Sequence, residues 1–94
     1  MRFQVGNRVA WVSQAGGSVV EKYGVVAEVV AALALPSRER FERLYRSGGV
    51  GTSRSHQSYV VMVDSTMRVS GKRKLVTHRV PRPYWPIVAK LKAR

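Results

Sequence analysis

The chain has 94 residues and a formal net charge of +12, with 17 Lys and Arg against 5 Asp and Glu, and no Cys. One domain over residues 1–94 is expected, and the lack of cysteine excludes disulfides and thiolate metal sites. A hydrophobic share of 45% is too high for a disordered chain. The N-terminus has no apolar signal segment, and the longest apolar run covers only residues 29–35. We therefore expect a cytoplasmic protein without membrane contact.

Basic residues are concentrated toward the C-terminus. Nine basic residues and no acidic residue follow Asp64. A small fold that gathers charge of one sign is destabilised by self-repulsion. An anionic partner is therefore expected, and nucleic acid is the commonest one.

Two strands are predicted in the first third of the chain. Alternation of apolar and polar residues marks residues 8–13, and a valine-rich stretch marks residues 19–32. Gly16 and Gly17 form the turn between them, because glycine tolerates positive φ. Gly24 is expected to bend or bulge the second strand.

Residues 33–55 are predicted to be an insertion that carries a short helix. Pro36 ends the preceding strand, Ser37 is suited to cap a helix, and residues 38–46 have helical periodicity. Phe41 and Leu44 form its narrow apolar stripe with Tyr45. So short a helix must dock through that stripe, or form only when bound. Residues 48–55 are predicted to be a mobile Gly/Ser-rich loop. Ion pairs are expected at i, i+4 spacing, Glu39 with Arg43 and Glu42 with Arg46.

The second half of the chain is predicted to continue as strands. Residues 57–64 alternate, with Tyr59, Val61 and Val63 on one face and Val60 and Met62 on the other. Turns are expected at residues 64–66 and 70–72, with a short returning strand at 67–69 and a basic strand at 73–80. Residues 81–86 are expected to be an extended aromatic and proline hook, and residues 86–94 a basic tail.

These elements indicate a mainly β fold, a small barrel of four or five strands with a helix inserted between strands 2 and 3. The segment Val5-Gly6-Asn7-Arg8-Val9, followed by Gly24-Val25-Val26, resembles the opening hairpin of SH3-like barrels of the KOW and Tudor-like families. The insertion is long for a KOW domain, and the aromatic cage of Tudor domains is not evident. The resemblance implies binding to RNA, DNA, or ribosomal and transcription proteins.

The basic strand and its surroundings are the candidate nucleic-acid site. Arginine binds phosphates in a bidentate way and lysine as a point charge. About 5–7 phosphate contacts would give a log–log salt slope of about −4.5 to −6. The alternative is a solubilising edge strand. The candidate residues are Arg68, Lys72, Arg73, Lys74, Arg79 and Arg82, with Arg43, Arg46 and Arg54 of the insertion and Tyr84 as a stacking residue. Trp85 is expected either to stack on bases or to plug the barrel.

Enzymatic activity is not expected, and neither is a cofactor. His56 and His78 lack metal-ligand spacing, and five acids leave little for acid–base chemistry. The sequence leaves open a second hypothesis, a protein-interaction adaptor or a phage or mobile-element inhibitor. Such a protein would occupy an acidic protein surface or a nucleic-acid channel, with Tyr45, Tyr84 and Trp85 as anchors.

Overall fold

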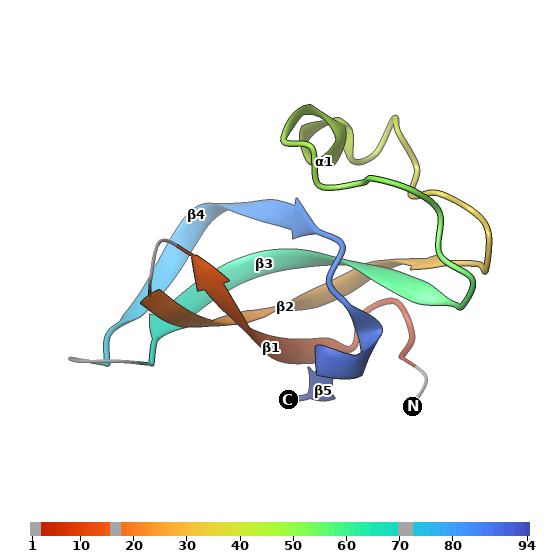
Figure 1. The fold of residues 1–94 in the computed structure, drawn as a ribbon. Helices are drawn as coiled ribbons and strands as arrows, with labels where there is room; N and C mark the ends of the chain where they lie inside the picture. Colours follow the sequence, from red (N-terminus) through yellow and green to blue (C-terminus); the bar gives the residue numbers. More distant parts are fainter. Residues whose placement is uncertain (1–2, 16–17, 70–72) are drawn as a thin grey trace.

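The structure, a computed structural model, describes residues 3–15, 18–69 and 73–94 and is mainly β, as predicted. Five antiparallel strands form one sheet in the order β4-β3-β2-β1-β5 (Figure 1). Within the described ranges β4 and β5 are the sheet's two edges, and the sheet is not closed. The elements in chain order are β1 (Arg8–Ala15), β2 (Ser18–Val30), α1 (Glu42–Arg46), β3 (Ser58–Arg68), β4 (Leu75–Tyr84), the 3-10 helix η1 (Val88–Lys90) and β5 (Lys92–Ala93).

β2 is the central strand, and its ladder with β3 is irregular at two places. The register shifts between Tyr23 and Gly24, where Asp64 of β3 is the extra residue, and again at Ala27 of β2. A register shift thus lies at Gly24 as predicted, but its extra residue belongs to β3 and not to the strand that carries Gly24. A Cβ at Gly24 would overlap the carbonyl oxygen of Met62, so the close approach of the two strands requires glycine. Such bulges bend a sheet and increase its twist.

The turn predicted at residues 64–66 is wrong, because β3 runs without interruption from Ser58 to Arg68. Ser65 pairs with β2 on one side and β4 on the other. Its side chain is buried, and its hydroxyl donates to the Asp64 carboxylate at 3.2 Å. The polar residues that suggest a turn therefore form a bulge within a long strand, and the predicted returning strand is the end of β3.

β4 also continues past its predicted end, through Pro81 and Pro83 to Tyr84. Prolines are tolerated here because β4 is an edge strand and pairs only with β3. Its pairing with β3 stops at Thr77 and resumes at Arg82, so residues 78–81 form a four-residue bulge opposite Asp64. This bulge turns part of the basic strand away from the ladder.

The helix of the insertion is shorter than predicted, five residues instead of nine. Residues 38–41 form a turn, and Phe41 has φ −125° and ψ 45°, outside the helical region. The backbone N–H of Ser37 donates to Glu28 at 2.9 Å, and the Ser37 hydroxyl accepts a long 3.4 Å bond from the Arg40 N–H. Tertiary contacts therefore set the conformation of this segment, as expected where local helix stability is low.

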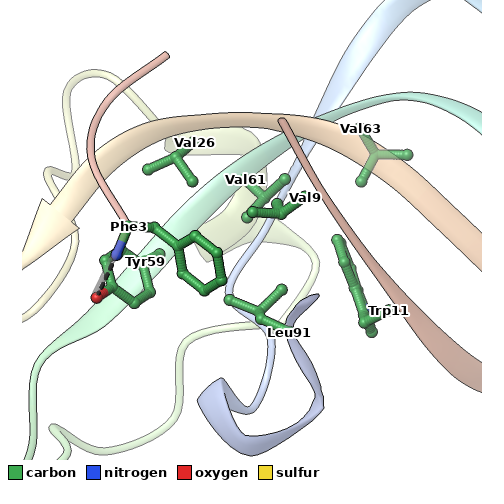
Figure 2. Packing of buried hydrophobic residues seen from close by; sticks show 8 residues of the cluster. All are labelled: Phe3, Val9, Trp11, Val26, Tyr59, Val61, Val63 and Leu91. Atoms are coloured by element: carbon green, nitrogen blue, oxygen red, sulfur yellow. Dashed lines mark hydrogen bonds between the residues drawn. The ribbon is translucent and has the colours of Figure 1, made fainter. Parts of the chain in front are cut away.

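Two apolar clusters lie on opposite faces of the sheet. The first, shown in Figure 2, gathers side chains from β1, β2, β3 and both ends of the chain. Phe3 packs edge-on against Tyr59 with ring centroids 5.4 Å apart, and its N–H donates to the Tyr59 hydroxyl at 3.0 Å. The members are Phe3, Val9, Trp11, Val26, Tyr59, Val61, Val63 and Leu91.

The second cluster joins the insertion to the other face of the sheet. Phe41 and Leu44 pack there with Val30, Val60 and Trp85. Because neighbouring strand residues point to opposite faces, Val61 belongs to the first cluster and Val60 to the second, as predicted. Trp85 is 5% exposed, and its indole N–H donates to the buried Ser58 hydroxyl at 2.8 Å. Trp85 is thus a core residue.

The C-terminal segment folds back onto β1. η1 leads into β5, in which Lys92 and Ala93 pair with Ala10 and Val9. The Lys92 ammonium lies 3.3 Å from the Glu21 carboxylate. The Arg94 guanidinium lies 3.8 Å from the Tyr23 ring centroid. Among the described residues, no helix is long and apolar enough to cross a membrane.

Candidate nucleic-acid interface

Two adjoining pockets open between α1 and β4. The larger has a volume of about 740 Å³ and is enclosed by α1 with the residues after it, by residues 82–86, and by Trp11 of β1. The smaller has a volume of about 360 Å³ and lies along the bulge of β4. Arg43 and Arg82 line both pockets, so the two adjoin, and we call them together the hollow.

Four arginines from two distant segments meet at this hollow. Arg43 and Arg46 come from α1, where i, i+3 spacing places them on neighbouring positions of the helix surface. Arg79 lies in the bulge of β4, and Arg82 lies opposite Val63 where pairing resumes. All four are exposed. We call Arg43, Arg46, Arg79 and Arg82 the arginine cluster.

Among the described residues, acidic side chains neutralise one member of this cluster, Arg46. The Arg46 guanidinium lies 3.0 Å from the Glu42 carboxylate, and both side chains are largely exposed. Exposed pairs of this kind contribute little and exchange readily with another anion. Within the described ranges, Arg43, Arg79 and Arg82 enter no ion pair, and the expected pair between Glu39 and Arg43 does not form. The remaining ion pairs are Arg8 with Asp64, Arg40 with Glu28, and Lys92 with Glu21.

Aromatic side chains form the inner wall of the larger pocket. Trp11, Tyr84 and Trp85 all line it. The rings of Trp11 and Tyr84 meet edge-on, 6.0 Å between centroids. Tyr84, a predicted stacking residue, is half-buried, whereas both tryptophans are at most 5% exposed. Tyr84 therefore offers the most accessible ring of the wall.

Lys22 is a basic residue near this wall that the sequence reasoning missed. It lies opposite Trp11 on β2, and its ammonium is 4.5 Å from the Tyr84 ring centroid. It also donates to the Ser13 hydroxyl at 2.8 Å, and burial lowers the pKa of Lys22. Strand alternation could have indicated that Lys22 shares a face with Trp11, but not that Tyr84 joins them.

Arg54, predicted to contact nucleic acid, is engaged inside the fold. Its guanidinium donates to the carbonyl oxygens of Trp85 at 2.6 Å and Pro86 at 2.7 Å. It also lies 3.8 Å from the Trp85 ring centroid, and burial lowers the pKa of Arg54. These contacts fasten the loop before β3 to the segment after β4.

The other predicted basic residues do not line either pocket. Arg68 lies at the end of β3, opposite Val20, and Lys74 is exposed just before β4. Arg73 is close enough to Glu21 to help lower the pKa of that carboxyl, so it lies toward the Glu21 side of the sheet. Lys72 lies outside the described residues. The basic strand is therefore divided, and Arg79 and Arg82 are its members at the hollow.

The two histidines lie in different parts of the fold, His56 exposed before β3 and His78 in the bulge of β4. His78 lines the smaller pocket, and its Nε2 lies 3.3 Å from the Thr66 hydroxyl. In the ranges that the structure covers, no three His, Cys, Asp or Glu side chains gather as metal ligands.

Comparison with protein-family models, curated proteins and solved structures finds no match.

Proposed function

We propose that the chain is a non-enzymatic nucleic-acid-binding module whose interface is the hollow between α1 and β4. The observation that carries this proposal is the meeting of the arginine cluster from two segments far apart in the chain. The pocket linings, as far as the structure describes them, include no acidic residue. Four guanidinium groups with so little internal neutralisation repel one another unless an anion lies between them.

Phosphate groups suit this arrangement. The planar guanidinium group binds phosphate oxygens through two parallel hydrogen bonds. Arg79 in the bulge and Arg43 on the helix both line the smaller pocket, so a backbone that runs along it could contact both. Each phosphate that is neutralised releases counterions, and binding is accordingly salt-dependent.

We also propose that the bent sheet is a partly open SH3-like barrel. The bulges at Asp64 and Ala27 support this proposal, because bulges curve strands toward closure. The pairing of β5 with β1 supports it as well, since it extends the sheet with the chain's last strand. A barrel of this kind would hold the hollow on a rigid frame.

Fluorescence anisotropy with short DNA and RNA at several salt concentrations tests the proposed function. Four arginine–phosphate contacts predict a log–log salt slope of about −3 for single strands and about −3.6 for duplex DNA. The variant Arg82→Gln should reduce the slope by about 0.7–0.9. Arg73→Gln, which removes the same charge away from the hollow, is the matched control and should leave the slope almost unchanged.

Absence of binding at about 50 mM salt, or binding without salt dependence, would overturn the proposal. Equal effects of Arg82→Gln and Arg73→Gln would assign binding to diffuse charge instead of the hollow. A pull-down from nuclease-treated lysate completes the test. A stoichiometric protein partner that survives nuclease, with no nucleic-acid binding by the pure protein, would replace the proposal with the adaptor hypothesis.

A further inference from the structure

We propose that the larger pocket receives an unpaired base of a bound single strand, while the arginine cluster holds the phosphates beside it. This inference rests on the proposed function and specifies its substrate class. The pocket volume of about 740 Å³ lies in the range of sites that enclose small organic groups. Contact with a phosphate backbone alone needs an exposed basic surface and no such recess.

The walls of the pocket match the two chemical parts of a nucleotide. The half-buried ring of Tyr84 is the aromatic surface that a base can stack on, and the buried Trp85 and Pro86 complete the apolar wall beside it. Arg43, Arg46 and Arg82 lie around the same pocket, where they can reach the charged backbone. Aromatic and basic side chains side by side are the combination that single-strand binding uses, because bases stack while phosphates pair with cations.

A polar group is also available for the edge of a base. Ser47 lines the pocket, and its hydroxyl donates to the Leu44 carbonyl oxygen at 3.0 Å. Its oxygen lone pairs can still accept a hydrogen bond. An unpaired base presents its Watson–Crick edge to a protein, whereas in a paired base that edge is occupied by the partner base.

A duplex fits the hollow less well. Its bases are stacked and paired, so none can enter the pocket without being flipped out. The only α-helix in the described ranges, α1, has five residues, which is less than two turns. A duplex would therefore contact the arginine cluster through phosphates alone and leave the aromatic wall unused. The structure favours a single strand for this reason.

The test compares oligothymidylate and oligouridylate of about 12 nucleotides with duplexes of the same length. The variant Ser47→Phe fills part of the pocket with a bulky side chain without changing charge, so less room is left for a base. It should weaken single-strand binding by about 5- to 150-fold, the effect of losing one stacked base, and leave duplex binding and its salt slope unchanged. Thr52→Phe is the matched control, because Thr52 is exposed and does not line the pocket. It should bind both substrates as the wild type does.

A second measurement uses the wild-type protein and needs no variant to fold. Oligonucleotides with 5-iodouracil are cross-linked by light, and the modified residues are mapped by mass spectrometry. Cross-links at Tyr84 or Trp11 are expected for the single strands. Cross-links confined to residues outside the pocket would overturn the inference, as would equal affinity for single strand and duplex. Binding to neither substrate would instead refute the proposed function itself.

Discussion

Replacing Arg54 with methionine should destabilise the fold without weakening nucleic-acid binding by the folded protein. Methionine keeps an unbranched apolar side chain but removes the guanidinium donors. Two hydrogen bonds, to the carbonyl oxygens of Trp85 and Pro86, and the stacking over the Trp85 ring are then lost. The loss should weaken the packing of the second cluster, in which Trp85 packs against the insertion.

The magnitude follows from these contacts. Hydrogen bonds to a charged group contribute about 1.5–3 kcal/mol each, and a cation–π contact about 0.5–2 kcal/mol. These values do not add fully, because Arg54 is partly exposed and water can reach some of the freed groups. We expect a loss of about 2–4 kcal/mol, a large share of the roughly 5–14 kcal/mol that a chain of this length can have.

Urea unfolding followed by circular dichroism measures this loss. The midpoint should fall by about 1–3 M at an unchanged slope. Arg38→Met is the matched control, because Arg38 is exposed and its guanidinium carbon lies 5.0 Å from the centroid of the Tyr45 ring. Its loss should stay below about 0.5 kcal/mol. If Arg54→Met also lost less than about 0.5 kcal/mol, or if folded Arg54→Met bound nucleic acid clearly more weakly, the structural role of Arg54 would be refuted.

Three further outcomes concern the sheet and its surroundings. Gly24→Ala should lower the free energy of unfolding by about 1–3 kcal/mol in chemical denaturation, because the added Cβ would overlap the backbone of β3. An unchanged midpoint would contradict the close approach of β2 and β3. Leu33 is exposed and has φ +67°, so Leu33→Gly should increase the free energy of unfolding by about 0.5–1 kcal/mol and raise the melting temperature measured by calorimetry. A lower melting temperature would count against backbone strain at this position. The Tyr23 hydroxyl donates to Glu21 and holds the pKa of that carboxyl below its ordinary value, with a smaller opposing effect of burial. The contribution of Glu21 to the free energy of unfolding is therefore complete above about pH 4.5 and is lost as pH falls through the lower pKa of the folded state. Tyr23→Phe should flatten the acid side of a curve of unfolding free energy against pH. Parallel curves for wild type and variant would exclude the contact.

The sequence predicts the fold class and the two faces of β3 because strand alternation is a local signal. Tyr59 and Val60 are assigned to opposite faces by spacing alone, and the two clusters confirm this. The ends of β3 and β4 were mispredicted, because Asp64, Ser65 and Pro81 are turn-forming residues that the fold accommodates as bulges and on an edge strand. Local composition does not reveal which strand lies at an edge.

The candidate site is predictable in part for a related reason. Its basic residues are visible in the composition, but their grouping depends on the docking of α1 beside β4. Arg54 and Arg82 look alike in the sequence, and only the tertiary contacts distinguish them. Arg54 binds the carbonyl oxygens of Trp85 and Pro86, whereas Arg82 is exposed at the hollow. The helix also begins later than predicted, so Glu39 lies before it and does not pair with Arg43, whereas Glu42 and Arg46 lie within it and do pair.

Both tryptophans of the chain, Trp11 and Trp85, line the larger pocket from different elements. The intrinsic tryptophan emission of this protein therefore reports on the lining of that pocket. Trp11 lies 6.0 Å from the centroid of the Tyr84 ring and Trp85 lies beneath the Arg54 guanidinium, so the two indoles have distinct surroundings and distinguishable quenching. A titration with unlabelled oligonucleotide can report occupancy of the pocket without any attached dye, and single-tryptophan variants can tell which wall responds first.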